Sequence, residues 1–387
     1  MTNFLLRLFV DNKHRTPTER RLRIGTVGGA CGIIANLLLS VIKLLAGIVF
    51  HSIALVADAV NNVTDAASSV ITFVGFKLSG KKADSDHPYG HGRVEYISGL
   101  IMAFLVLFLG ITLAKSALER VLSPKPLIFS YLGVAVMVIS IVVKLWLSVF
   151  YKKLQTETDS STFGAASCDS RNDVISTSAV LVCTLIYAFT DVNLDGIVGL
   201  AVSVFIVVSG IGLIKETLDP LLGQPPPPEL VDEISAKVLS YDEIIGIHDL
   251  VVHNYGPGRM FASLHVEIPY DSDFMYIHDL VDNIEKEFMT SLGIETVIHM
   301  DPIVTDDPVI NDLKAHIVDI TASIDKRLTI HDFRAVPGPT HTNVIFDIVV
   351  PSEFPFDDKC LKEKIDTLLT EEHPECFTVI TFDRSYI

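Results

Sequence analysis

The sequence has few cysteines and none of the short motifs that mark the common classes of enzyme. Its five cysteines are odd in number, scattered and without a CxxC pair. This pattern is typical of small buried side chains in a reducing compartment and argues against a disulfide framework or a thiolate metal site. Walker, GxSxG and HExxH sequences are all missing, so ATP-driven pumping and hydrolysis lack their residues. We therefore expect neither an enzyme nor an organic cofactor.

Basic residues are in the minority. The chain has 30 Lys and Arg against 47 Asp and Glu, which gives a formal net charge of −17. Nucleic-acid binding needs a basic surface, so this balance argues against it. Hydrophobic residues nevertheless make up 49% of the 387 residues. A single soluble core rarely combines both properties, so we expect one part of the chain to face lipid and an acidic part to face water.

Long apolar runs occupy the first half of the chain. Each is close to the ~20 residues that a helix needs to cross a hydrocarbon core of roughly 30 Å. We therefore predict an all-α transmembrane domain over residues 1–214. Its six helices are expected at about 25–48, 53–77, 97–115, 128–150, 161–190 and 197–214.

The charges of the connections predict how these helices are oriented. The N-terminus and the connections 77–96 and 151–160 are basic, whereas those near 49–52 and 191–196 carry no Lys or Arg. The connection 115–127 has three basic residues and goes against this trend. On balance the positive-inside rule predicts a multi-pass plasma (inner) membrane protein with both termini in the cytoplasm.

The second half of the chain contains an internal repeat. Residues 215–228 end in four consecutive prolines, which stop a helix and predict a stiff linker. Beyond them, Ile247-His248-Asp249-Leu250 recurs as Ile330-His331-Asp332-Phe333, and the whole pattern has a period of about 82 residues. We predict two tandem cytoplasmic α+β domains of metallochaperone (ferredoxin-like) type, over 229–303 and 304–387. Each would consist of a helix, two strands, a helix and a strand.

Four polar side chains inside the predicted membrane helices suggest a metal site. Ionisable groups at bilayer depth are costly, so those present need a reason. Asn61 and Asp65 are four residues apart on the second helix, as are Asp169 and Asp173 on the fifth, so each pair lies on one helix face. If the helices pack together, these four residues (the quartet) can bind one divalent cation. The alternative is that they only join helices through hydrogen bonds.

The predicted membrane helices also contain Lys43, Lys144, Asp58 and Arg171. Lys43 and Lys144 are near predicted helix ends, so we expect their ammonium groups to snorkel to the interface. Asp58 and Arg171 are expected to support the quartet. Arg171 is two residues from each aspartate of its helix and therefore points away from both, with Asp58 as a candidate partner.

These features together resemble the cation diffusion facilitator family. The resemblance covers roughly residues 20–303. It rests on the six helices, on the soluble C-terminal domain and on three segments: Asp58-Ala-Val-Asn61-Asn-Val-Thr-Asp65, Asp169-Ser-Arg-Asn-Asp173 and Asp86-His87-Pro-Tyr-Gly90-His91-Gly92-Arg93-Val-Glu95. It implies a homodimer in the lipid bilayer that exports a divalent metal ion from the cytoplasm in exchange for protons. The quartet would be its transport site.

Manganese is the metal that the quartet favours. Zinc-exporting members usually place histidine in at least one quartet position, whereas this chain has none there and resembles the manganese-exporting bacterial members. Zinc prefers nitrogen and sulfur ligands, while all-oxygen sites suit harder ions such as Mn²⁺. Without histidine, the carboxylates would carry the exchanged protons. Efflux of Zn²⁺, Fe²⁺ or Cd²⁺ remains open, as do a cation channel and a metal-sensing membrane protein without antiport.

Two further groups match the positions of metal sites in zinc-exporting members. The first is Asp84, His87 and His91 in the second connection, where the alternative is a loop whose histidines only cap or hydrogen-bond. The second, in the first repeat, consists of His248, His265, His278, His299 and Asp301. Zn²⁺ or another divalent metal is expected at these sites, with an inherited structural role as the alternative.

The second repeat keeps only part of that set. It retains His331 and Asp383, the latter at the position of Asp301. It has Asp347, Cys360 and Thr381 where the first repeat has His265, His278 and His299. Because most of the nitrogen ligands are lost, we expect this copy to serve packing or dimerisation.

Overall fold

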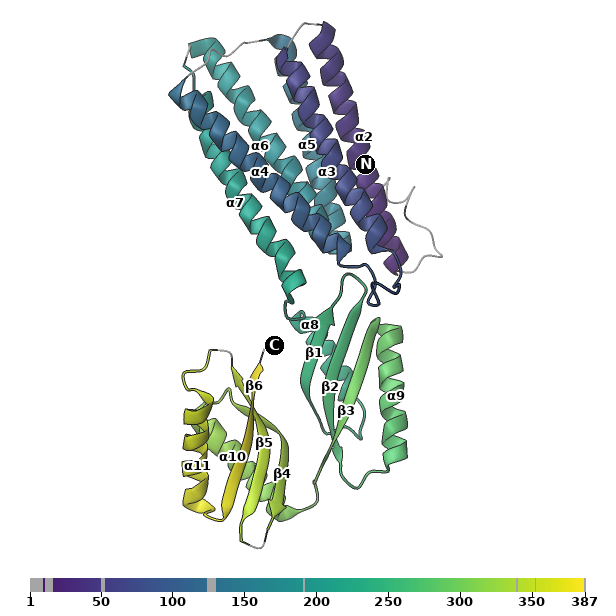
Figure 1. Ribbon diagram of the computed structural model, residues 1–387, viewed down its shortest axis with the longest axis vertical. Coiled ribbons are helices and arrows are strands. Elements are labelled where there is room, and N and C mark those ends of the chain that lie inside the picture. The colour runs from purple at the N-terminus through teal and green to yellow at the C-terminus, as the bar shows by residue number, and fades with distance from the viewer. Residues whose placement is uncertain are drawn as a thin grey trace. The chain divides into compact units, whose positions relative to one another are not determined.

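The computed structural model describes residues 10, 17–49, 53–123, 130–190, 192–338, 340–351 and 353–385. The chain forms two compact units. The first consists of Met1–Gln224 with Asn254–Arg259, and the second of Pro225–His253 with Met260–Ile387. Figure 1 shows long helices in the first unit and two small sheets with flanking helices in the second.

Six long helices make up the described part of the first unit. They are α2 (Pro17–Val49), α3 (Ile53–Ser79), α4 (Val94–Leu122), α5 (Tyr131–Thr158), α6 (Ser161–Thr190) and α7 (Asp195–Leu222). Each coincides with one of the six helices predicted from the sequence. Within the described residues, all but α3 are long and apolar enough to cross a membrane on their own. Their exposed faces carry mainly Leu, Ile, Val and Phe, as lipid contact requires.

The six helices pack mainly in three pairs, α2 with α3, α4 with α7 and α5 with α6. Glycine permits close approach in two of these pairs. A Cβ added at Gly29 of α2 would lie 2.7 Å from the Cα of Phe73 on α3. A Cβ at Gly210 of α7 would lie 2.9 Å from the Cα of Leu107 on α4. Small residues at such contacts are how membrane helices bring their backbones together.

The end of the last membrane helix differs from the prediction. α7 runs to Leu222, beyond the boundary expected at residue 214. Lys215 and Glu216 end the apolar run, but both favour helix and do not stop it. The segment between helices is therefore 223–227 rather than 215–228, because α8 begins at Pro228, where a proline at the first helical position is tolerated.

The second unit contains two copies of one arrangement. The first copy consists of α8 (Pro228–Val238), β1 (Gly246–Asn254), β2 (Met260–Pro269), α9 (Phe274–Ser291) and β3 (Ile294–Ile303). The second consists of α10 (Pro308–Ile324), β4 (Thr329–Pro337), β5 (Thr342–Pro351), α11 (Asp358–Glu372) and β6 (Cys376–Ser385). Both have the predicted order of helix, two strands, helix and strand. The sheets run β1-β2-β3 and β4-β5-β6, each with its last two strands parallel.

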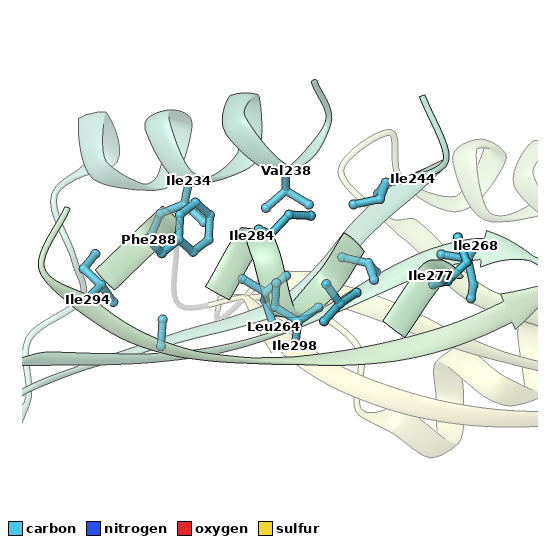
Figure 2. Close-up of a cluster of buried hydrophobic side chains, with 13 residues drawn as sticks. Ile234, Val238, Ile244, Leu264, Ile268, Ile277, Ile284, Phe288, Ile294 and Ile298 are labelled. Carbon is cyan, nitrogen blue, oxygen red and sulfur yellow. The ribbon is translucent and has the colours of Figure 1, made fainter. Parts of the chain in front are cut away.

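Each copy has its own hydrophobic core between its helices and its sheet. Figure 2 shows the first core, in which side chains of both helices meet side chains of the strands: Ile234 and Val238 of α8, Ile284 and Phe288 of α9, Leu264 of β2 and Ile298 of β3. Both helices therefore cover the same face of the sheet. The strands use alternate residues for this contact, which leaves the intervening residues, histidines among them, for the opposite face.

Candidate metal-binding sites

Three of the predicted aspartates come together among the membrane helices. Lys144 of α5 lies between two of them, with its Nζ 2.7 Å from Asp65 Oδ2 on α3 and 2.5 Å from Asp173 Oδ2 on α6. Asp169, one turn before Asp173, interacts electrostatically with Asp65, Asp173 and Lys144. Asp65, Lys144, Asp169 and Asp173 thus form one charged group, called here the membrane cluster.

Hydrogen bonds between neighbouring helices fix the position of the membrane cluster. One turn beyond Lys144, Ser148 of α5 exchanges hydrogen bonds with Ser167 of α6, each hydroxyl donating to the other backbone carbonyl at 3.1 and 3.0 Å. On the other side, Ser40 of α2 donates to the carbonyl of Ala59 on α3 at 2.8 Å. Such contacts hold the register of helices where no water competes for them. They hold α5 against α6 and α2 against α3 close to the carboxylates.

The two lysines do not snorkel as expected. Lys144 and Lys43 are both buried, at 5% and 4% exposure. α5 continues to Thr158 rather than ending near residue 150, which places Lys144 in the middle of the helix. Lys43 Nζ donates to Asn62 Oδ1 at 2.6 Å, and Asn62 Nδ2 donates to Asp65 Oδ2 at 3.3 Å. The prediction was wrong for Lys144 because α5 is longer than expected, and for Lys43 because its ammonium group has a buried partner on α3.

Two other predicted residues, Asn61 and Arg171, make no described hydrogen bond or ion pair with the membrane cluster. Asn61 is exposed, and within the described residues no hydrogen bond joins it to the aspartates; its neighbour Asn62 makes that contact instead. Arg171 lies 3.4 Å from Cys168 Sγ and its guanidinium 5.9 Å from the ring centroid of Phe205 on α7. The side chain of Asp58 lies outside the described residues.

The second connection brings its three predicted residues together. Asp84 Oδ1 is 3.4 Å from His87 Nδ1, and Asp84 Oδ2 is 3.6 Å from His91 Nε2. One donor atom of each lies within 4.8 Å of the others, so the group is compact enough to hold a metal ion. A hydrogen bond from Lys81, at 2.6 Å, holds the pKa of the Asp84 carboxyl below its usual range. The same ammonium would compete with a metal ion for Asp84.

In the first repeat, three histidines lie close to the carboxylate of Asp301 on β3. Its carboxylate lies 2.9 Å from His265 Nδ1, 3.3 Å from His248 Nε2 and 3.3 Å from His299 Nε2. His248 Nε2 is buried and has no hydrogen-bond partner, as expected of an atom positioned to bind a metal ion. His278 of α9 is exposed, and among the described contacts none joins it to this group.

The second repeat has the same backbone register with different side chains. Asp347 and Thr381 face each other across β5 and β6, just as His265 and His299 do across β2 and β3. The nitrogen pair is therefore absent from this position of the second repeat. Asp383 remains, and burial raises the pKa of its carboxyl. The internal alignment made from the sequence is reproduced by the strand pairing.

Two family profiles match this chain between residues 30 and 303. Residues 30–222 match the profile of the cation efflux transmembrane domain, and residues 226–303 match that of the cation efflux protein cytoplasmic domain. The second repeat, 304–387, lies beyond both matched regions.

Several curated proteins are similar to the chain. An uncharacterized transporter of Methanocaldococcus jannaschii is 29% identical over 270 residues, which cover 70% of this chain and 95% of that protein. The manganese efflux system protein MneS of Bacillus subtilis is 28% identical over 285 residues, 73% of this chain and 97% of that protein. The cation-efflux pump FieF of Yersinia enterocolitica is 28% identical over 271 residues, 70% and 90% of the two chains.

Proposed function

Because this chain belongs to the cation diffusion facilitator family, whose members are multi-pass membrane transporters of divalent cations with a cytoplasmic C-terminal domain, we propose that it exports Mn²⁺ from the cytoplasm in exchange for protons. The membrane cluster carries this proposal. Its three aspartates offer carboxylate oxygens as ligands, which suits Mn²⁺ better than Zn²⁺. The similarity to MneS, a protein named for manganese efflux, points the same way.

The charges around the membrane cluster favour a divalent ion. Three carboxylates face two ammonium groups, Lys144 in direct contact and Lys43 through Asn62. Buried charges are tolerated when they are compensated. If a divalent ion took the place of the Lys144 ammonium, the ion and the Lys43 ammonium together would balance the negative charges of the three carboxylates.

We therefore propose that Lys144 acts as a tethered cation of the empty site. Its Nζ contacts both Asp65 of α3 and Asp173 of α6, and a metal ion bound by these carboxylates would join the same two helices. Metal entry would displace the ammonium, and its return would help to expel the ion. Asn61, one turn from Asp65, would join the ligands once the ammonium has left. Protons would be carried on the carboxylates during the return step.

The proposed setting is supported by the family and by the charges of the connections between helices. We place the chain in the plasma membrane as a homodimer with both termini in the cytoplasm. The two metallochaperone-like domains form its C-terminal part. Residues 1–9 lie outside the described part of the chain. Efflux of Zn²⁺, Fe²⁺ or Cd²⁺ through the same cluster is the alternative, since cation-efflux pumps match this chain about as closely as MneS does.

Transport in proteoliposomes with an enclosed pH-sensitive dye tests the proposal. We expect Mn²⁺ movement with counterflow of protons in the unmodified protein, and loss of both in Asp65→Ala and Asp169→Ala. Asp219→Ala is the matched control, because Asp219 lies on α7 outside the membrane cluster. Movement of Zn²⁺ alone would contradict the choice of metal. Mn²⁺ flux that survives both substitutions would place the transport site elsewhere.

A further inference from the structure

Three potential ligands from both repeats meet within the second unit. His331 of β4 has its Nε2 3.6 Å from Asp249 Oδ1 on β1 and 3.3 Å from Asp383 Oδ2 on β6. One ligand atom of each residue lies within 4.8 Å of the others. Metal–ligand bonds of roughly 2.0–2.3 Å separate neighbouring ligand atoms by comparable distances. The three side chains are therefore close enough to share one ion, and they come from three strands of two sheets.

The second observation is that two of these atoms have no partner. His331 is 7% exposed. Its Nε2 and Asp383 Oδ2 are both buried and make no hydrogen bond, although they face each other at 3.3 Å. Buried polar atoms in native proteins are nearly always satisfied by hydrogen bonds, water or an ion. A cation between them would accept a lone pair from each atom.

The backbone at Asp249 is bent in a way that aspartate rarely adopts. Its φ is 52°, in the left-handed region, and Asp332 at the equivalent position of the second repeat has a φ of 49°. The Asp249 carboxylate lies between two histidines, 3.3 Å from His248 Nδ1 and 3.6 Å from His331 Nε2. Both repeats have this bend at the same position, so it belongs to the fold of the repeat. It places Asp249 between the two repeats.

The equivalent position in the second repeat is already occupied. The Asp332 carboxylate accepts a hydrogen bond from Arg334 at 2.9 Å, and its backbone N–H donates to Glu267 Oε1 at 3.2 Å. The pseudo-symmetry of the repeats therefore gives one shared position for a metal ion rather than two. This position is also distinct from the group of His265, His299 and Asp301, which lies wholly in the first repeat.

We propose that Asp249, His331 and Asp383 form a divalent-metal site shared by the two repeats, called here the inter-repeat site. One imidazole nitrogen and two carboxylates suit a first-row ion such as Mn²⁺ or Zn²⁺, with water at the remaining positions. The second repeat then contributes ligands as well as packing. His248 touches both sites, since its Nδ1 faces Asp249 and its Nε2 faces Asp301.

The test measures Mn²⁺ bound to the full-length protein in detergent. The background variant carries alanine at Asp65 and Asp169 and at five histidines: His87, His91, His248, His265 and His299. It removes two carboxylates of the membrane cluster and the nitrogen ligands of the second connection and of the first repeat. The result is therefore independent of whether the chain transports manganese. Bound Mn²⁺ is counted after equilibrium dialysis, and pulsed electron paramagnetic resonance detects nitrogen coupled to it. We expect one Mn²⁺ per chain with coupling to one histidine nitrogen.

Adding His331→Ala should abolish the nitrogen coupling and weaken binding at least tenfold. Adding Asp383→Asn should weaken binding to a similar extent and preserve the coupling, which shows that the chain is still folded. The matched control is His341→Ala, an exposed histidine of the second repeat. A background variant that binds no Mn²⁺, or nitrogen coupling that persists in the His331→Ala variant, would overturn the proposal.

Discussion

The Nζ of Lys144 lies 2.7 Å from Asp65 Oδ2, so a buried ammonium lies among the carboxylates that we propose as the transport site. The same ammonium contacts Asp173 on another helix. A cation that belongs to the protein can compensate the carboxylates without being transported. This relationship gives the first prediction.

Replacing Lys144 by methionine should tighten Mn²⁺ binding. The substitution keeps an unbranched side chain that is one atom shorter and removes its charge, so the metal ion no longer has to displace an ammonium. We expect at least a tenfold increase in affinity, measured by titration of the full-length protein, together with slower turnover because the ion is released less readily. Lys152→Met, at an exposed position of the same helix, should leave both quantities unchanged. An affinity that falls or stays constant in Lys144→Met would refute the role of a tethered cation.

Replacing Arg21 by alanine should destabilise the membrane helices strongly. Arg21 of α2 makes two parallel hydrogen bonds of 2.7 and 2.8 Å to Glu95 of α4, whose side chain is fully buried. Removing one partner of a buried pair leaves an uncompensated charge and costs about 3–5 kcal/mol. Thermal unfolding in detergent measures the loss.

The adjacent arginine provides the control for that experiment. Arg20 pairs with Glu157 at 3.4 Å in a more exposed position. Arg20→Ala should change stability by less than about 1 kcal/mol, as is usual for surface pairs. Equal losses of stability in the two variants would mean that the burial of Glu95 does not increase the cost of removing its partner.

Alanine at position 29 should destabilise the protein, whereas alanine at position 212 should not. An added Cβ at Gly29 would lie 2.7 Å from the backbone of Phe73, while at Gly212 no atom lies within 4 Å. Gly29→Ala therefore forces α2 and α3 apart and should cost about 1–3 kcal/mol. Gly212→Ala should be neutral or stabilising by up to about 1 kcal/mol, because alanine favours helix. Thermal unfolding of the two variants, compared with that of the unmodified protein, measures these changes in stability.

Removing the ammonium of Lys81 should strengthen metal binding in the second connection. Lys81 donates to Asp84 Oδ2, which is one of the oxygens available to an ion. Because this pair is exposed, the gain is modest, about two- to fivefold in Zn²⁺ affinity. Binding to Lys81→Met and to its neighbour Lys82→Met is compared, and only the first should bind more tightly. A lower affinity in Lys81→Met would show that Lys81 organises the loop instead of competing with the metal.

Much of this architecture could be predicted from the sequence. Apolar runs located the six helices, and the recurrence of Ile-His-Asp located the second repeat, because both are periodic signals that need no tertiary information. The family segments identified Asp65, Asp169 and Asp173 as a group.

What the sequence missed depends on contacts between distant segments. Lys144 and Asp65 are 79 residues apart, and nothing in the local pattern around Lys144 indicates an ion pair. Asn62 differs from Asn61 by a rotation of about 100° on the helix. That rotation decides which amide reaches Asp65, and it is set by the packing of α2 against α3. The position of Asp249 opposite His331 likewise requires both repeats to be folded.

The short tether between the two repeats affects how the inter-repeat site would behave on dilution. β3 ends at Ile303 and α10 begins at Pro308, so only residues 304–307 separate the two folded copies. A tether this short keeps each copy at an effective concentration on the order of millimolar around the other. Encounter of the two copies is therefore a property of a single molecule. Whatever the abundance of the protein in its membrane, the ligands of the two copies would meet equally often.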